Sequence, residues 1–461
     1  MLLNYYEESL IKNTKLPSEW QSQLALDELS SFLQFNWEQR SVFYDDGQVT
    51  SRQQFIEFVG QRGIKTKNYI GTVVFKGQQL NIFPKVFRTE KDDNDRDDLD
   101  TNHLMKNLVQ WIEYCGKIDY PYMSITSELD DSTNLRELFV ILYIRYVKNA
   151  LDRGLFYRYE EHVEDTSLIK GRIDFRDYFI KKYPNGRVDK FKCEYSNFEH
   201  DNVLNRIIKY TCKSLINEVS GKNQKVIRHI LMKLADVSDV KCSPYDCDKV
   251  RLSKLQGHYQ IILSMSKMLL LNKTSTYNVD NAESFCFLFP TEVLFEGFIG
   301  GFIQSALGSD AKVRLQASDE SLFSDVQYLG ESLGKAFIMK HDILVEHKEK
   351  GVFILDTKYK MINRFAGSDN VKQRVNQEAN STDIYQVLAY ARTRNLQDVY
   401  LLYPLFRFED IEPGNPFGIN EVKDSQGNAI NVHIVRLPFV FEDDIENTKL
   451  KLREVITNII T

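Results

Sequence analysis

The chain has 461 residues, more than one hydrophobic core usually supports, so we expect two or three domains. Hydrophobic residues make up 43% and charged residues 27%, which is ordinary globular usage and argues against a mainly disordered or fibrous protein. The formal net charge of -6 excludes a uniformly basic surface, so any contact with nucleic acid has to come from a local basic patch.

The six cysteines are scattered along the chain. The closest pair, Cys242 and Cys247, lacks both the spacing of a zinc site and a second pair of ligands, which is typical of reduced thiols. The chain starts without a basic segment followed by an apolar run, and no stretch reaches about 18 uncharged apolar residues. We therefore expect a cytoplasmic protein that neither is secreted nor spans a membrane.

Residues 1–88 predict a mixed N-terminal domain. It combines a helical region with the stretch YIGTVVFKGQQLNIFPKVF, which is rich in strand-forming residues and has Lys76-Gly77 as its hairpin turn. Residues 90–100 then hold seven acidic and two basic side chains. We expect residues 89–101 to be an acidic linker or exposed loop, with DNA mimicry or the docking of a partner as alternatives.

Residues 102–284 are dominated by helical patterns and predict a mostly helical middle domain. The stretch LRELFVILYIRYVKNALDRG ends at Gly154 in the way that glycines end helices. Residues 169–175 favour a strand entry, and residues 200–215 favour a helix for which Asp201 is the candidate N-cap.

From about Phe285 the pattern changes to helix, strand, strand, helix and strand, which predicts an α/β (α+β) domain over residues 285–461. Two of its strands, joined by the short polar stretch HKEKG, form a hairpin. If the turn centres on Glu349, antiparallel pairing brings Asp342 directly opposite Asp356, at about 4.5–5.5 Å, with Lys358 on the same face.

Two facing carboxylates repel each other, and a bound Mg²⁺ turns that repulsion into coordination. Lys358 would bring positive charge beside the metal, to orient or help deprotonate an attacking water and to contact a phosphate. The alternative is a surface hairpin with a salt bridge between Asp356 and Lys358. A hydrolytic site is favoured because Asp356 ends the apolar strand VFILD and Asp342 interrupts the partner strand at the facing position.

The helix predicted at residues 290–307 precedes the hairpin and begins with a proline at a helix-start position. Glu292 lies in its first turn, where an acid complements the helix dipole. Glu296 lies among apolar residues instead. We expect Glu296 to lean over the site and to bind the metal directly or through water.

The helix predicted at residues 381–394 follows the hairpin and carries Gln386 and Tyr390 on one face. These two side chains could hydrogen-bond a phosphate or the water network of the metal, or they could simply be solvated. Residues 398–404 predict another buried strand. The stretch between hairpin and helix is basic, with Lys358, Lys360, Arg364, Lys372 and Arg374.

The order of these residues resembles the PD-(D/E)xK nuclease superfamily, particularly its branch with a Q-x-x-x-Y helix. The residues that carry the resemblance are Glu296, Asp342, Asp356-Thr357-Lys358, Gln386 and Tyr390. More specifically, the chain resembles the McrC family, the nuclease subunits of McrBC modification-dependent restriction systems. Six stretches spread over most of the chain support this: YIGTVV…LNIFPK (69–85), KGRIDF (170–175), DNVLNRIIK (201–209), FLFPTEVLFEGFI (287–299), ILDTKYK (354–360) and DIYQVLAYA (383–391).

The chain departs from the family pattern in two places. His341 precedes Asp342 where the family usually has proline, which leaves the metal ligand in place but makes the strand entry less certain. The chain is also long for the family, with the acidic linker as the expected insertion.

The resemblance implies Mg²⁺-dependent cleavage of double-stranded methylated DNA together with an McrB-like AAA+ GTPase hexamer. GTP would be bound by that partner, since the nearest approach to a phosphate-binding loop here, GESLGKA at 330–336, is one residue short and ends in alanine. It also implies that residues 1–88 and part of the middle domain dock to the partner ring. A docking activator that does not cut, and a nuclease that acts alone, remain alternatives.

Overall fold

The computed structural model of the chain describes most residues from 2 to 460 and leaves out several internal stretches. The described ranges are 2–39, 51–60, 63–89, 101–115, 135–219, 221–253, 256–274, 284–323, 325–328, 331–332, 334–361, 381–407, 417–423, 429–442 and 444–460. The predicted acidic stretch at 90–100 and the basic residues Arg364, Lys372 and Arg374 therefore lie outside the described residues.

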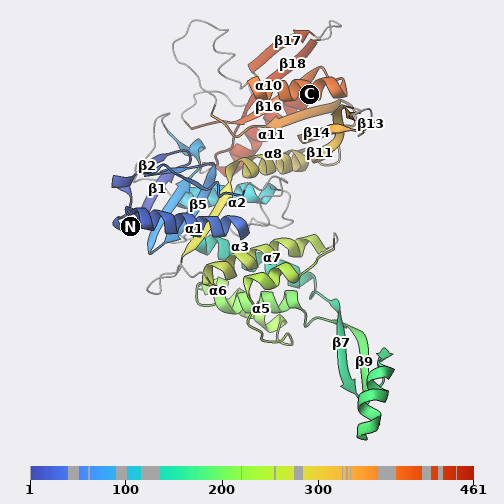
Figure 1. Cartoon of the computed structure of the whole chain (residues 1–461). Coiled ribbons are helices and arrows are strands. Elements are labelled where there is room, and N and C mark those ends of the chain that lie inside the picture. The colour runs from blue at the N-terminus through green and yellow to red at the C-terminus, as the bar shows by residue number, and fades with distance from the viewer. Residues whose placement is uncertain are drawn as a thin grey trace. The chain divides into compact units, whose positions relative to one another are not determined.

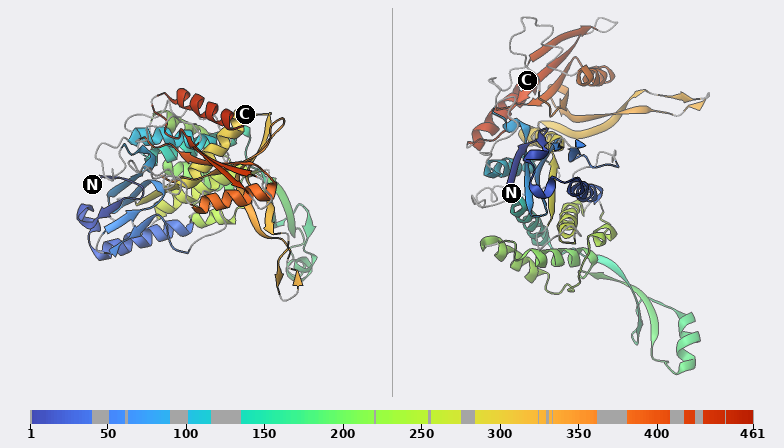
Figure 2. Two further views of the ribbon diagram at one scale, coloured as in Figure 1. Left: turned by 90° about the horizontal axis from the view of Figure 1, so that it is seen from above. Right: turned by 60° about the vertical axis from the view of Figure 1, so that its left-hand side comes forward.

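The chain forms two units (Figures 1 and 2). The first comprises Met1–Glu38, Phe43–Leu135 and Tyr277–Thr461, and the second comprises Gln39–Val42 and Arg136–Thr276. The division differs from the predicted boundaries: the first unit continues to Leu135, within the predicted middle domain, and it includes the C-terminal part of the chain together with the N-terminal region. None of the helices in the described part of the chain is long and apolar enough to cross a membrane.

A four-stranded sheet begins the first unit, in the order β1 (Leu2–Tyr6), β6 (Gln78–Phe83), β5 (Tyr69–Phe75) and β10 (Phe285–Pro290). The β5–β6 turn has φ of 51° at Lys76 and 72° at Gly77, the left-handed values of a tight hairpin turn, which confirms the prediction. Strand β10 pairs antiparallel with β5. Residues expected to open the nuclease domain therefore belong to the N-terminal sheet.

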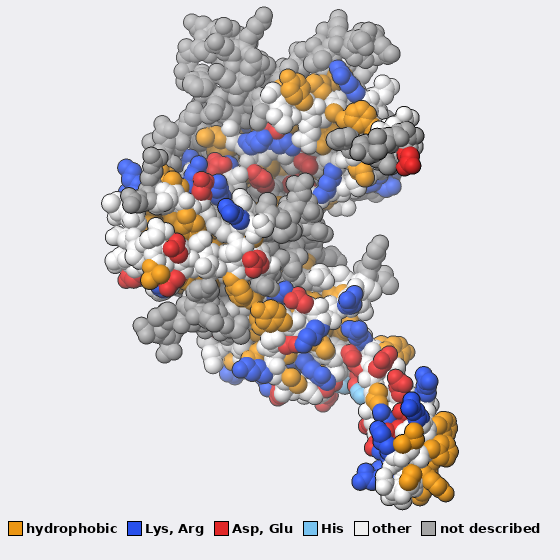
Figure 3. All heavy atoms as spheres, in the orientation of Figure 1, with side chains coloured by type: hydrophobic (Ala, Val, Ile, Leu, Met, Phe, Trp, Pro, Cys, Tyr) orange, Lys and Arg blue, Asp and Glu red, His pale blue; other side chains and the backbone are white. Residues whose placement is uncertain are grey.

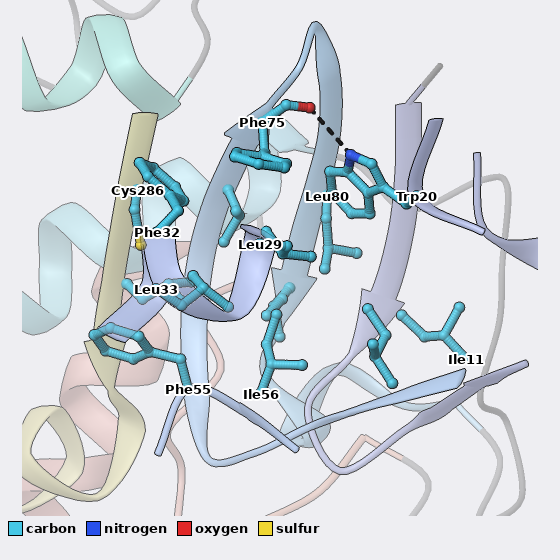
Figure 4. Packing of buried hydrophobic residues seen from close by; sticks show 14 of the residues in the cluster. Ile11, Trp20, Leu29, Phe32, Leu33, Phe55, Ile56, Phe75, Leu80 and Cys286 are labelled. Carbon is cyan, nitrogen blue, oxygen red and sulfur yellow. Dashed lines mark hydrogen bonds between the residues drawn. The ribbon is translucent and has the colours of Figure 1, made fainter. Parts of the chain in front are cut away.

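Helix α1 (Gln23–Gln39) packs on this sheet (Figure 4). Phe32 stacks on Phe75 with ring centroids 5.4 Å apart, and the indole of Trp20 donates a 3.1 Å hydrogen bond to the carbonyl of Phe75. A small sheet, β2 (Leu10–Lys12), β4 (Gly63–Thr66) and β3 (Ile56–Phe58), joins the same core. Three short 3₁₀ helices complete the described region: Asn13–Lys15, Ser18–Trp20 and Lys85–Phe87.

The C-terminal part of the first unit is built on a six-stranded sheet. Its order is β11 (Ala311–Phe323), β14 (Ala336–His347), β15 (Gly351–Thr357), β16 (Asp398–Pro404), β18 (Ala429–Leu437) and β17 (Phe417–Lys423). Strands β15, β16 and β18 run parallel, and the other pairs are antiparallel. A two-stranded ladder, β12 (Gln327–Tyr328) and β13 (Glu331–Ser332), lies between β11 and β14 in sequence.

Helix α10 (Ser381–Arg394) covers one face of this sheet, where Val387 and Ala391 pack against Leu344 and Ile354. Side chains alternate along a strand, so strand residues two positions from Leu344 or Ile354 also lie on the face that α10 covers. The other described helices of this unit are α8 (Thr291–Leu307), α2 (Thr101–Tyr114) and α11 (Ile445–Ile460). Helix α2 packs on α8 and stacks Trp111 on Phe439 at 4.3 Å. The predicted helices at 290–307 and 381–394 and the strand at 398–404 are confirmed.

The second unit contains α3 (Leu135–Arg153), α5 (Val203–Leu215), α6 (Gly221–Lys233), α7 (Gly257–Thr274) and the 3₁₀ helix Pro244–Lys249. As predicted, α3 ends at a glycine, Gly154, with φ of 137°. One predicted cap is wrong. Asn202 accepts the capping bond from the amide of Asn205, whereas Asp201 accepts from the side chains of Arg206 and Ser238.

A three-stranded ribbon extends from these helices (Figures 1 and 2). We call it the arm: β7 (Arg158–Thr166), β8 (Arg172–Ile173), β9 (Phe191–Glu199) and the short helical turns Phe175–Asp177, Tyr178–Lys182 and Tyr183–Asn185. The mostly helical prediction captured only its strand entry near Arg172. Strand β7 is exposed along most of its length and lacks apolar alternation. Strand β9 does alternate Phe191, Cys193 and Tyr195 with polar residues, and the prediction missed this signal.

Candidate metal centre

The hairpin of β14 and β15 pairs in the register that the sequence predicts. Its ladder runs from His347 opposite Gly351 to Ile343 opposite Leu355, so the turn centres on Glu349. One step further in the same register, Asp342 faces Asp356. Asp342 and Asp356 alternate with Ile343 and Leu355, and they therefore share the face that α10 covers.

Asp356 is the buried member of this pair, with 0% of its surface exposed. Lys358 forms an ion pair with the carboxylate, but neither oxygen accepts a well-formed hydrogen bond from a described residue. Burial and the charge of Asp342 raise the pKa of Asp356 to about 7, although Lys358 acts in the opposite direction. Lys358 supplies one positive charge, whereas Asp356 and the facing Asp342 can carry two negative charges, so the residues fit an additional cation such as Mg²⁺.

Asp342 is oriented by Thr357, the residue after Asp356. The amide and the hydroxyl of Thr357 both donate to Oδ2 of Asp342, at 2.9 and 3.0 Å. Oδ1 takes part in neither bond and remains able to bind a metal. Sequence reasoning missed Thr357 because it occupies the variable position between the aspartate and the lysine of the motif.

Lys358 is held at the end of β15, where its amide donates a 2.8 Å hydrogen bond to the carbonyl of Leu402 on β16. Burial opposes the charge on its side chain, but Asp356 and Asp342 outweigh burial and raise the pKa of Lys358. The ammonium group therefore remains charged at neutral pH beside the two carboxylates.

Glu296 on α8 is half-buried, and the charges of Asp342 and Lys358 act on its carboxylate. Burial and the charge of Asp342 raise its pKa. Its Oε1 accepts a 2.6 Å hydrogen bond from the side chain of Gln316 on β11. Gln316 lies opposite Asp342 in the β11–β14 register and has φ of 50°, a left-handed value that strains a residue with a side chain. No sequence signal pointed to Gln316.

In the part of the chain that the structure describes, no three His, Cys, Asp or Glu side chains lie close enough together to hold a metal ion on their own. Two carboxylates still suit Mg²⁺, which keeps several waters and usually binds one or two carboxylates together with substrate phosphates.

Gln386 and Tyr390 share one face of α10, as predicted, and are bonded to each other. The amide of Gln386 donates to the hydroxyl of Tyr390 at 2.6 Å, and that hydroxyl donates to the carbonyl of Lys340 at 2.9 Å. The ring of Tyr390 also packs edge-on against His341 at 4.5 Å. Both side chains are thus fastened to β14, two residues before Asp342.

Asp383, in the first turn of α10, is a further buried carboxylate at this site. It binds the ammonium group of Lys360 at 2.8 and 3.0 Å and accepts a 3.1 Å hydrogen bond from the hydroxyl of Tyr403. Its charge also acts on Asp356 and Lys358. The sequence suggested only a helix start here, because an acid in a first turn is common without any site.

Comparisons with known proteins bear on the whole chain. A family model described as the McrBC 5-methylcytosine restriction system component matches residues 64–404. No curated relative matches the chain. A chain in the refined half-complex from the tetradecameric assembly of Thermococcus gammatolerans McrB AAA+ hexamers with bound McrC has 17% identity and a TM-score of 0.61, over 100% of both chains. This likeness shows a shared fold.

A chain in the cryo-EM structure of the Thermococcus gammatolerans McrBC complex has 16% identity and a TM-score of 0.44, over 67% of this chain and 89% of that chain. The family model carries the assignment because it spans well over half of the sequence. The chain belongs to the family of McrBC 5-methylcytosine restriction system components.

Proposed function

We propose that this chain is the DNA-cutting subunit of a modification-dependent, 5-methylcytosine type restriction system. In this proposal it is a Mg²⁺-dependent endodeoxyribonuclease that acts with an McrB-like AAA+ GTPase hexamer. The observation that carries the proposal is Asp356, a buried carboxylate that faces Asp342 and forms an ion pair with Lys358.

The metal would be held by Asp342 and Asp356, with Glu296 bonded to one of its waters. Bound Mg²⁺ would supply positive charge against the phosphate and the oxygens that enter and leave during hydrolysis. Thr357 fixes the Oδ2 oxygen of Asp342, so Oδ1 is the oxygen offered to the metal. Lys358 brings its ammonium group to the phosphate and orients the attacking water.

Gln386 and Tyr390 would support the site from α10. Tyr390 holds the backbone of β14 at Lys340, and Gln386 holds the hydroxyl of Tyr390. This arrangement orients the strand that carries Asp342. The Gln386 amide has a second N–H, so a contact with a phosphate would not break its bond to Tyr390. Its first role in the proposal is orientation.

The arm of the second unit is the surface that we assign to the partner. Its exposed apolar side chains include Tyr159, Val163, Leu168, Phe175, Phe179, Ile180 and Tyr183, between 57% and 71% exposed. Figure 3 shows such side chains gathered on the arm beside lysines and arginines. Contiguous exposed apolar surface commonly marks a protein interface. The solved relative contains McrB AAA+ hexamers with bound McrC, which makes a hexameric AAA+ ring the proposed occupant.

This assignment moves the docking role from residues 1–88 to the arm. The described N-terminal sheets pack most of their apolar residues into their own core and expose a few, such as Leu2 and Leu10, whereas the arm exposes many of its apolar residues. Residues 1–88 then serve mainly as part of the unit that holds the nuclease site.

The proposed function is tested with the purified chain, its McrB-type partner, Mg²⁺ and GTP on supercoiled plasmids. The expected result is cutting of a plasmid carrying 5-methylcytosine and no cutting of the same plasmid without modification. Cutting without the partner would show a nuclease that acts alone. Stimulated GTP hydrolysis without cutting, under Mg²⁺ and under Mn²⁺, would show a docking activator instead.

A further inference from the structure

Glu7 is a fully buried carboxylate just after strand β1, at the edge of the N-terminal sheet. Three groups donate to it. The amide of Lys85 donates to Oε1 at 2.9 Å, the hydroxyl of Tyr359 to Oε1 at 2.5 Å, and the hydroxyl of Thr291 to Oε2 at 2.8 Å. Glu7 therefore joins three segments that lie far apart in the sequence.

Two of these donors come from the segments that carry the candidate site. Tyr359 directly follows Lys358, and Thr291 is the first residue of α8, the helix that carries Glu296. One carboxylate thus connects the chain beside Lys358 with the helix that holds Glu296. Neither Tyr359 nor Thr291 can move away from the other without breaking a bond to Glu7.

Tyr359 is fixed on more than its hydroxyl. The ammonium group of Lys85 lies 4.9 Å from the centre of its ring, and the ring of Phe295 on α8 lies at 5.9 Å. Lys85 is itself buried and paired with Glu8 at 3.0 Å. Two residues that follow strands of the N-terminal sheet therefore hold Tyr359: Glu7 bonds to its hydroxyl and Lys85 lies over its ring.

Lys358 is consequently anchored by both of its neighbours and by its own backbone. Its amide bonds to Leu402, Tyr359 bonds to Glu7, and Lys360 bonds to Asp383. A side chain that has to stay beside Asp356 in the absence of a metal needs such fixation, because a long lysine otherwise samples many rotamers.

Burying a carboxylate is expensive compared with packing an apolar residue of similar size. Burial raises the pKa of Glu7, while Lys85 and the hydrogen bonds from Tyr359 and Thr291 oppose that shift. An apolar residue could fill this space, but it could not accept the two hydroxyls, which bond to different oxygens of Glu7. We therefore expect Glu7 to fix the positions of Tyr359 and Thr291 rather than to raise the free energy of unfolding.

We propose that Glu7 is a positioning residue for the nuclease site, which fixes Lys358 relative to helix α8 and Glu296 through Tyr359 and Thr291. The N-terminal sheet then forms part of the support of the site. This inference rests on the proposed nuclease function.

The test compares full-length variants that remove one bond each. Tyr359→Phe and Thr291→Val remove a hydroxyl with little change of shape, and Glu7→Gln removes the charge. Thr291→Ser keeps the hydroxyl and serves as the rescue variant. Tyr143→Phe is the matched control, since Tyr143 is an equally buried tyrosine in the second unit, with its hydroxyl 3.0 Å from Ser266.

Cutting of methylated plasmid is measured with the partner over a range of Mg²⁺ concentrations, well below the unfolding temperature of each variant. We expect Tyr359→Phe, Thr291→Val and Glu7→Gln to lower the rate at saturating Mg²⁺ at least tenfold, while Thr291→Ser and Tyr143→Phe cut like the wild type. Combining Glu7→Gln with Tyr359→Phe should lower the rate by less than the product of the two single effects, because both changes weaken the same hydrogen-bonded group. Wild-type rates in the stably folded single variants would overturn the inference and leave the proposed function intact.

A second readout needs neither DNA nor partner. Amide hydrogen exchange of the isolated chain should speed up at Lys358 and Lys360 at least tenfold in Glu7→Gln and Tyr359→Phe, with β18 unchanged. Unchanged exchange at these two amides would overturn the inference. Faster exchange at both amides, together with no cutting of DNA by the wild type, would mean that only the proposed function has failed.

Discussion

Asp342 accepts two hydrogen bonds at the same oxygen, Oδ2, from the amide and the hydroxyl of Thr357. The residue between the aspartate and the lysine of the motif thus orients the carboxylate on the opposite strand. The hairpin that brings Asp342 and Asp356 face to face therefore also fixes the orientation of the Asp342 carboxylate.

Replacing Thr357 with valine removes the hydroxyl and leaves the amide bond to Asp342. We expect the free energy of unfolding to fall by only about 1 kcal/mol, the usual contribution of one hydrogen bond. The Mg²⁺ concentration that gives half-maximal cutting should rise several-fold, because Asp342 loses part of its orientation. Thr393→Val on α10, which removes a hydroxyl bonded to the carbonyl of Ala389, is the control and should leave that concentration unchanged.

The raised pKa of Asp356 predicts how pH acts on stability and on metal binding. Below the ordinary aspartate pKa of 3.8 the carboxyl is neutral in both states, and as the pH rises to about 7 the folded state holds its proton longer than the unfolded state. The free energy of unfolding should therefore fall across this window in the absence of metal. Above pH 7, Asp356→Asn should be the more stable protein without Mg²⁺.

Thermal unfolding at pH 5 and pH 8, with and without Mg²⁺, checks this prediction. Mg²⁺ should stabilise the wild type more at pH 8 than at pH 5, because protons compete with the metal for Asp356. Asp398→Asn, on the neighbouring strand β16 and paired with His433, is the control and should keep the response to Mg²⁺. An equal effect of Mg²⁺ at both pH values would argue against Asp356 as a ligand.

Gln316 has a strained backbone conformation and donates a hydrogen bond to Glu296. Its φ of 50° is better suited to glycine, so Gln316→Gly should leave the free energy of unfolding unchanged or raise it by about 1 kcal/mol. Cutting should nevertheless fall, because Glu296 loses its donor. Asn395→Gly, at φ of 54° after α10, is the matched control and should not affect cutting. Unaltered cutting by Gln316→Gly would exclude Gln316 from the site.

Charged substitutions on the arm separate docking from folding. Phe179→Asp and Ile180→Asp replace side chains that are each 62% exposed, so the thermal unfolding midpoint should not change. Binding to the McrB-type partner and stimulation of its GTP hydrolysis should be lost. Met232→Asp on α6, at a residue that is 75% exposed outside the arm, should bind normally. Normal binding by both arm variants would locate the docking surface elsewhere.

The sequence predicted the hairpin well because its signal is local. The turn HKEKG sets the register, and the register alone makes Asp342 face Asp356. Helix α10 was equally visible, and its partners Gln386 and Tyr390 follow from helical spacing. The family assignment rested on the order of such motifs, and the family model confirms it.

Other parts depend on contacts that no local pattern reveals. Glu7 and Tyr359 lie 352 positions apart in the sequence, so no local pattern near either residue predicts their hydrogen bond. Strand β10 was assigned to the nuclease domain because it precedes α8, but its pairing partner is β5. The arm was missed because β7 is mostly exposed and carries no apolar alternation, although its partner β9 does. Asp201 was preferred over Asn202 because both residue types cap helices.

Cutting of methylated plasmid by the complex that contains Asp356→Asn tests the central claim most directly. Asparagine keeps the shape of the side chain but loses the charge that would hold Mg²⁺. We predict that this complex does not cut, while the variant still stimulates GTP hydrolysis by the partner and Asp398→Asn cuts normally. Cutting by a folded Asp356→Asn variant at the wild-type rate would contradict the account.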